Sequence, residues 1–261
     1  MTATLRRVTQ GLQSRLLRMT PPPWRLPLTF LRYRLRTGPG ARQWFHELEQ
    51  LRRWSGPNQT AIDVGANEGL YSYKFAQWFG TVEAFEPNPV MAHQLRQYGA
   101  GNVRVHELAL SSSARQADLH VPVTARGFEL HGWGTIEAAA FGAAREQRTV
   151  PVQVRTLDSF QFGNVSVLKI DVEGHERDVL IGAGDTIDRC RPVVLTEVKT
   201  DSRQFVTDFF RTRRYRFYCW EAGRFVELQD GLGAWTTRSE NLFAIPDEQS
   251  GAITSRTGVH P

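Results

Sequence analysis

The chain has 261 residues and a formal net charge of +5, with 41% hydrophobic and 23% charged residues. This length is sufficient for one sizeable α/β domain with residues left over for a terminal extension. Two cysteines, Cys190 and Cys219, support neither a disulfide framework nor a thiolate metal site. We find no apolar run near the ~18 residues of a membrane-spanning helix and no signal-peptide pattern, so we expect a cytoplasmic protein.

Positive charge is concentrated at the N-terminus. Residues 1–45 hold nine arginines and no acidic residue, whereas the rest of the chain holds 23 basic and 27 acidic residues. The first 20 residues resemble a basic amphipathic helix, which can lie on an anionic membrane at the inner face. Docking on the protein's own body and disorder are the alternatives. Nucleic-acid binding is not expected, because the arginines are not interleaved with an aromatic stacking platform.

We therefore divide the chain into an N-terminal extension (1–40), a main domain (41–246) and a polar C-terminal tail (247–261). The main domain is predicted to begin with an amphipathic helix over residues 41–54.

The most informative segment is a strand, a glycine turn and a helix that begin at Ala61. Gly65 and Gly69 can adopt backbone angles closed to other residues and allow close approach of a ligand. A second strand follows and ends at Glu86, whose carboxylate can accept hydrogen bonds from both hydroxyls of a ribose. This pattern predicts an adenosine cofactor without a 2'-phosphate.

The glycine spacing distinguishes between cofactors. Dinucleotide sites use G-x-G-x-x-G, but here Ala66 and Asn67 follow Gly65. Asp63 would repel a diphosphate and could instead hold the amino group of a methionine moiety. S-adenosylmethionine therefore fits better than NAD. The alternative is a glycine turn that only packs a helix on a sheet.

The middle of the chain departs from simple alternation of strands and helices. Residues 103–110 are predicted to form a third strand, and alternating segments at 118–123 and 149–156 indicate a small β insertion. This insertion is a candidate wall of the acceptor pocket. Trp133, in an exposed turn within it, could stack on a sugar or have only a structural role.

A second group of charged residues follows a buried strand that ends near residue 170. Asp171, Glu173 and His175 are expected at the mouth of the sheet, in the same crevice as Gly65 and Glu86. A fifth strand over 193–197 ends in another acid, Glu197. A helix to about residue 213 and strands near 217–220 and 242–245 complete the domain.

Five segments in this order resemble the FkbM family of S-adenosylmethionine-dependent methyltransferases. They are Asp63 to Gly69, Phe85 to Pro89, Ala109 to Ser111, Thr156 to Ser159 and Lys169 to Glu176. The resemblance covers roughly residues 58 to 200. It implies a class I methyltransferase fold, which is Rossmann-like, with a mostly parallel seven-stranded sheet and helices on both faces.

The resemblance also implies O-methylation, often of sugars or polyketide-type hydroxyls. The positions that it adds to the cofactor site are Pro87, Asn88, Ala109, Leu110 and Asp171, with Ala109 and Leu110 near the adenine. Together with Asp63, Gly65, Ala66, Asn67, Gly69 and Glu86, these are the predicted cofactor-binding residues.

Transfer to an alcohol requires a group that removes its proton. His175, Asp171, Glu173 and Glu197 are the candidate bases, and His175 has the ordinary pKa nearest to operating pH. His175 could equally be a solvent-facing helix residue. A divalent ion such as Mg²⁺ is a second route, with Asp171, Glu173 and Glu197 as candidate ligands if they converge.

Two further classes of function stay open at this stage. A non-catalytic partner subunit that binds S-adenosylmethionine would retain Gly65 and Glu86 without the acidic cluster. An NAD-dependent oxidoreductase is disfavoured by the glycine spacing and by the lack of a Tyr-x-x-x-Lys pair. The sequence predicts an O-methyltransferase that acts on a sugar, glycan, glycolipid or secondary metabolite, and does not indicate its acceptor or oligomeric state.

Overall fold

The computed structural model describes residues 21–35, 39–124, 127, 129–130, 134–137, 146–229 and 241–254. The predicted amphipathic helix within residues 1–20 lies outside this part of the chain, as do Trp133 and residues 255–261 of the predicted tail. Among the described residues, no helix is long and apolar enough to cross a membrane.

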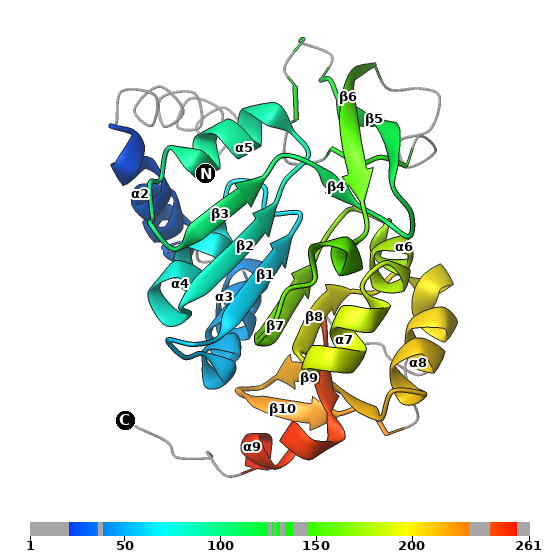
Figure 1. Cartoon of the computed structure of the whole chain (residues 1–261). Helices are drawn as coiled ribbons and strands as arrows, with labels where there is room; N and C mark the ends of the chain where they lie inside the picture. The colour runs from blue at the N-terminus through cyan, green and yellow to red at the C-terminus, as the bar shows by residue number, and fades with distance from the viewer. Residues whose placement is uncertain are drawn as a thin grey trace.

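A large sheet of eight strands runs through the centre of the domain, in the order β10-β9-β11-β8-β7-β1-β2-β3 (Figure 1). From β3 to β8, adjacent strands are parallel. The bounds are β1 Thr60–Val64, β2 Thr81–Phe85, β3 Val103–His106, β7 Val165–Ile170, β8 Val193–Glu197, β9 Tyr215–Glu221, β10 Arg224–Glu227 and β11 Asn241–Pro246.

The strand order reverses between β1 and β7, because the chain extends the sheet on one side through β3 and on the other side through β8. Ligands of open α/β sheets bind outside the carboxyl ends of the strands at such a reversal. The topology therefore places a binding crevice where β1, β2 and β7 end.

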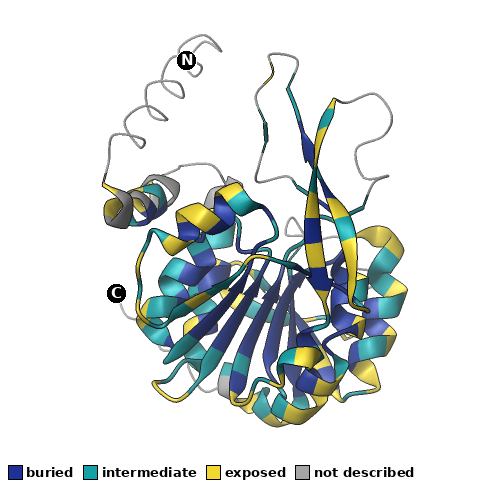
Figure 2. Cartoon of the chain, turned by 45° about the horizontal axis from the view of Figure 1, so that its top comes forward, coloured by how far each residue is buried: buried dark blue, intermediate teal, exposed yellow. Residues whose placement is uncertain are grey.

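Helices cover both faces of the sheet, which explains why the central strands are continuously apolar (Figure 2). On one face, Leu48, Phe75 and Phe79 pack against strand residues such as Val167. The helices near this face are α2 Pro22–Arg34, α3 Pro39–Gln50, η1 Leu51–Trp54, α4 Leu70–Trp78 and α5 Pro89–Arg96.

The opposite face is covered by the helices that follow β7 and β8. Val179, Ile187 and Phe210 from these helices pack on Ile62 and Leu168 of the sheet. These helices are α6 Glu176–Ile181, α7 Gly184–Cys190, η5 Thr200–Ser202 and α8 Arg203–Arg211, and η4 Leu157–Phe160 precedes β7.

The predicted mostly parallel sheet is confirmed, but it has eight strands rather than seven. The additional strand is β10, which forms an antiparallel hairpin with β9 at the edge. Ala222 and Gly223 at its turn both have positive φ angles, of 49° and 80°, and such a turn matches the twist of paired antiparallel strands. β11 is antiparallel to both of its neighbours.

The predicted β insertion forms a second sheet of three strands, in the order β4-β6-β5. Its strands are β4 Ala109–Leu110, β5 Arg115–Pro122 and β6 Gln147–Arg155. The single strand predicted over 103–110 is therefore two strands, because a turn at Leu108, whose N–H donates to the His106 carbonyl, directs β4 away from the large sheet and onto β6. The small sheet stands over the carboxyl ends of the large sheet (Figure 1).

Both predicted terminal segments contain helices. In the N-terminal extension, α2 buries Leu26 and Phe30. In the predicted polar tail, η6 Asp247–Gln249 and α9 Gly251–Thr254 follow β11, and Glu248 pairs with Arg191 at 2.9 Å. These helices pack on the domain. The division of the chain at residues 40 and 246 stays a prediction from composition and charge.

Candidate active site

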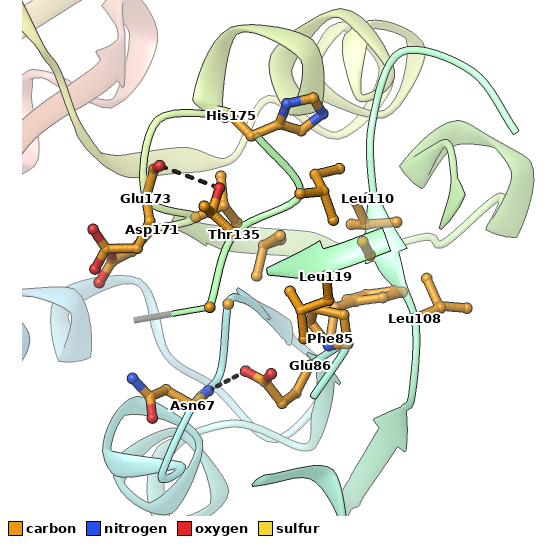
Figure 3. A pocket seen from close by; sticks show the side chains of 17 residues that line it. Asn67, Phe85, Glu86, Leu108, Leu110, Leu119, Thr135, Asp171, Glu173 and His175 are labelled. Carbon is orange, nitrogen blue, oxygen red and sulfur yellow. Dashed lines mark hydrogen bonds between the residues drawn. The ribbon is translucent and has the colours of Figure 1, made fainter. Parts of the chain in front are cut away.

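A cavity lies where β1, β2 and β7 end, between the large sheet and the small one (Figure 3). The lining residues are Val64, Gly65, Asn67, Phe85, Glu86, Pro87, Leu108, Ala109, Leu110, Leu119, Gly134, Thr135, Ile136, Asp171, Val172, Glu173 and His175. The predicted residues from the three strand ends are therefore brought together.

Glu86 follows the end of β2 and is only 6% exposed. One of its carboxylate oxygens accepts from the Asn67 N–H at 2.7 Å (Figure 3). The other accepts from the Asn88 N–H at 2.8 Å. A carboxylate oxygen has two acceptor positions, so each retains one for a ligand. Burial raises the pKa of Glu86 to about 7, against the opposing effect of the two backbone hydrogen bonds.

Asn67 and Asn88 act on Glu86 through their main chains. Asn67 has a φ of 51°, in the left-handed region, and this conformation directs its N–H at the carboxylate. The Asn88 side chain caps α5, because its Oδ1 accepts from the Val90 N–H at 3.0 Å. Of the two predicted neighbours of Glu86, Pro87 lines the cavity and Asn88 is the cap behind it.

The glycines of the loop are required by internal packing as well as by backbone conformation. Gly65 has a φ of +72°, and a Cβ there would lie 1.9 Å from the carbonyl oxygen of Asp171. Gly69 has a φ of +82°, and its Cβ would lie 2.3 Å from Leu95 Cδ1. Ala66 is buried against the same leucine. The two glycines thus allow other segments of the protein to pack closely against the loop. This is the alternative stated from the sequence, in which the glycine turn serves packing.

Asp63 is fully buried beneath the loop and is not among the residues that line the cavity. Its Oδ2 accepts from the N–H and the hydroxyl of Ser72, at 3.0 and 2.7 Å, and its Oδ1 lies 3.2 Å from Lys169 Nζ. This carboxylate is held by the protein's own groups, rather than being directed at the position expected for a cofactor amino group.

Lys169, near the carboxyl end of the buried strand β7, extends this network. Its ammonium donates to the carbonyl of Gly65 at 2.8 Å and lies 3.7 Å from Asp171. Burial alone would lower the pKa of Lys169, but the charges of Asp63 and Asp171 overcome it and the pKa is raised. The lysine therefore carries its charge and ties β7 to the loop of residues 65–69, which we call the cofactor loop.

Asp171 and Glu173 both line the cavity, and Figure 3 shows their carboxylates on the same side of it. Burial, and then the charge of Asp171, raises the pKa of Glu173, while Lys199 opposes the shift. Glu173 has a φ of 54°, and its carbonyl accepts from the Thr135 hydroxyl at 3.4 Å. The two carboxylates are therefore positioned by a strained loop and by the insertion.

His175 is 4% exposed, and both of its ring nitrogens have partners. Nδ1 lies 2.5 Å from Glu137 and Nε2 lies 2.9 Å from the Ser111 hydroxyl. Because Ser111 accepts from Arg115 at 2.9 Å, its own hydrogen can go to Nε2, which leaves the Nδ1 hydrogen for Glu137. Figure 3 shows the ring turned away from Asp171 and Glu173. The alternative of a solvent-facing His175 is therefore excluded.

The predicted metal ligands do not form a group in the structure. Glu197 ends β8 but is not among the lining residues. Among the described residues, the histidine and acidic groups whose ligand atoms lie within 4.8 Å of one another are Glu137, His175 and Asp178. A Mg²⁺ site at Asp171, Glu173 and Glu197 thus has no support.

Sequence reasoning missed several residues that shape this site. Lys169 begins the last of the five segments that resemble the FkbM family, and a lysine inside a mainly apolar strand is the signal for a buried charge. Thr135 and Glu137 belong to the insertion, where no pattern distinguished them. By contrast, Ala109 and Leu110 line the cavity as expected, although they are on the small sheet.

The parallel sheet with its reversal between β1 and β7, the antiparallel strand β11 between β8 and β9, and the cavity at the strand ends define the class I methyltransferase fold. The family model described as methyltransferase FkbM domain matches residues 63–218. The chain therefore belongs to the FkbM methyltransferase family.

Solved structures of similar fold are remote in sequence. The FkbM methyltransferase from Methylobacillus flagellatus has 16% identity over 72% of this chain and a TM-score of 0.47; this chain spans 44% of that protein. A precorrin-6y C5,15-methyltransferase from Geobacter metallireducens has 14% identity, coverage of 74% and 82% of the two chains, and a TM-score of 0.38. No curated protein matches in sequence.

The two causes of glycine preference at position 65 can be separated by substitution. Gly65→Ala is expected to lower the free energy of unfolding by about 3 kcal/mol or more, because it adds a clash with the Asp171 carbonyl to the backbone strain. Urea unfolding measures the loss.

Gly99→Ala is the matched control, since Gly99 has a φ of +69° but its nearest neighbouring atom would lie 4.0 Å from the added Cβ. It should cost only the strain of about 1 to 2 kcal/mol. Equal losses for the two variants would contradict the role of the close contact.

Proposed function

We propose that the chain is an S-adenosylmethionine-dependent O-methyltransferase that acts on a hydroxyl of a sugar, glycan, glycolipid or secondary metabolite. The observation that carries the proposal is the buried Glu86 carboxylate, which the backbone N–H groups of Asn67 and Asn88 hold at the cavity. Its two remaining acceptor positions match the two hydroxyls of a ribose.

The residues around Glu86 fit the rest of this cofactor. Ala109 and Leu110 give apolar surface for an adenine, while Asp171 and Glu173 supply negative charge on the opposite side. Carboxylates here favour a positively charged amino or sulfonium group and disfavour a pyrophosphate. The cavity thus supports S-adenosylmethionine over NAD by its charge as well as by its glycine spacing.

S-adenosylmethionine supplies an activated methyl group, so the protein must orient the acceptor, exclude water and remove one proton. Bound at this cavity, the cofactor would supply the methyl group to the acceptor oxygen, and a carboxylate of the protein would take up the hydroxyl proton. Glu173 is the favoured base, because its raised pKa is closer to operating pH. Asp171 is instead paired with Lys169, whose ammonium lies 3.7 Å from its carboxylate.

The other candidate bases are placed less favourably. Both nitrogens of His175 are occupied by Glu137 and Ser111, and Glu197 does not line the cavity. We assign His175 a positioning role, in which it fastens the insertion to the start of α6. The predicted contact of residues 1–20 with an anionic membrane stays a separate proposal, in which the tail would hold the enzyme near a lipid-linked acceptor.

Calorimetric titration with S-adenosylhomocysteine tests the cofactor assignment. Micromolar binding is expected for the wild type, with a loss of at least about tenfold in Glu86→Ala, because the ribose hydroxyls lose a charged acceptor.

NAD titrated in parallel should give no heat of binding, and Glu221→Gln, on an exposed side chain of β9, should bind as the wild type does. Binding of NAD, or silence with S-adenosylhomocysteine, would reject the proposed cofactor.

The affinity for S-adenosylhomocysteine is expected to rise with pH up to about 7 and then level off. Hydroxyl donors favour the ionised Glu86, whose pKa is about 7 in the free protein, so affinity falls by up to about tenfold per unit below that value. The raised pKa has the opposite effect on folding: its contribution to stability is present at low pH and is lost as pH rises through 7.

Glu86→Gln cannot titrate at this position and should show no such rise. Calorimetry at several pH values compares the two proteins, and an unchanged pH profile in the variant would assign the titration to another group.

Glu173→Gln is expected to lower the rate of methyl transfer by about 10²- to 10⁴-fold, because it removes the proton acceptor. Its effect on the affinity for S-adenosylhomocysteine should be much smaller, because Asp171 still supplies negative charge near the amino group. Transfer of labelled methyl from S-adenosylmethionine to a panel of sugars, glycolipids and alcohols measures the rate. Glu221→Gln again provides the control, and full turnover in Glu173→Gln would place the base elsewhere.

A further inference from the structure

The helix α2 exposes a row of large apolar side chains. Trp24, Leu28 and Leu31 are 64%, 42% and 47% exposed, and Leu35, one residue beyond the helix, is 69% exposed. The Leu35 N–H still donates to the Leu31 carbonyl at 3.0 Å, so the helical path continues to that residue. Among the described residues, six large hydrophobic side chains are exposed, and four of them belong to this short segment.

The four side chains form one stripe. At 100° per residue, the positions 24, 28, 31 and 35 fall within about 60° of one another around the helix axis. Leu26 and Phe30, which are 7% exposed, fall on the opposite side. The helix thus has two apolar faces, and only one of them is needed to pack on the domain.

The inner face attaches α2 firmly to the domain and to the cofactor loop. The Phe30 ring lies 5.3 Å from Tyr73 and 5.8 Å from Phe45, between ring centroids. Leu26 packs with Ala66 and Leu95, and its Cδ2 would lie 3.3 Å from a Cβ on Gly69. The inner face therefore ties α2 to the domain, and the stripe lies on the other side of the helix; Figure 1 shows α2 at the edge of the domain.

Charge identifies the occupant of the outer face. The sequence of the helix contains no acidic residue and three arginines, at positions 25, 32 and 34. Residues 1–45 as a whole contain nine arginines and no acid. Leucine and tryptophan flanked by arginine is the composition of a helix that lies in the interface of an anionic membrane.

We infer that the outer face of α2 docks on an anionic lipid surface. A second copy of the chain is a poorer occupant, because a stable protein interface takes about 20 to 30 residues a side and this stripe offers four. Docking there would set the neighbouring cavity close to the membrane surface. The inference goes beyond the proposed reaction and does not depend on it.

Cosedimentation of the full chain with vesicles tests the inference. The wild type is expected to pellet with vesicles of phosphatidylcholine and phosphatidylglycerol, and not with phosphatidylcholine alone. Leu28→Glu/Leu31→Glu should lower the partition coefficient at least about tenfold, because two apolar contacts are lost and two like charges face the lipid.

Ile181→Glu is the matched control, since Ile181 is 44% exposed on α6, far from the stripe in sequence; it should bind as the wild type does. Thermal unfolding verifies that each variant is folded, independently of cofactor binding. Trp24→Ala/Leu35→Ala provides a second, milder pair with a smaller loss in the same direction.

Three results would overturn the inference. The first is a wild type that stays in the supernatant or binds neutral vesicles equally well. The second is a Leu28→Glu/Leu31→Glu variant that pellets like the wild type, which would locate the contact elsewhere. The third is a concentration-dependent dimer, seen by sedimentation equilibrium and abolished by the same variant, which would make the stripe an interface between copies of the chain.

Discussion

One buried ammonium group connects the central sheet to the cofactor loop. Lys169 is 3% exposed, and its Nζ lies 3.2 Å from Asp63 on β1 while it donates to the carbonyl of Gly65. An uncompensated charge in this position would cost several kcal/mol, so the strand pair and the turn after it are stable only in this arrangement. The ion pair acts as a constraint on geometry more than as a source of net stability.

The geometry of the cavity follows from that constraint. With the Gly65 turn held against the Asp171 carbonyl, Asn67 is brought to the position from which its N–H binds Glu86. The same ammonium lies 3.7 Å from the Asp171 carboxylate. Burial, and then the charge of Asp171, raises the pKa of Glu173. Three carboxylates thus surround one cavity, and this local charge suits the cationic cofactor that we propose.

The sequence predicted most of the large sheet because its signals are local. Apolar runs that end in glycine and acid, such as the one from Ala61 to Gly69, identify both the strand and the loop that follows it. The split of residues 103–110 into two strands and the position of Glu137 were not predictable in this way. The first depends on the pairing of Ala109 with Val154 of β6, and the second on the contact of Glu137 with His175, 38 residues away. Contacts this distant leave no periodic signal in either segment.

The sequence by itself determined the class of fold, the family and the residues that gather at the strand ends, because parallel strands necessarily bring their carboxyl ends to one edge. Only the tertiary structure decided what each of these residues does there. His175 is turned into a hydrogen-bonded pair with Glu137, Asp63 is held beneath the loop, and Glu86 and Glu173 face the cavity. The physical reason is that a side chain's direction, burial and partners depend on residues distant in the chain, whereas its place at the end of a strand depends only on its neighbours.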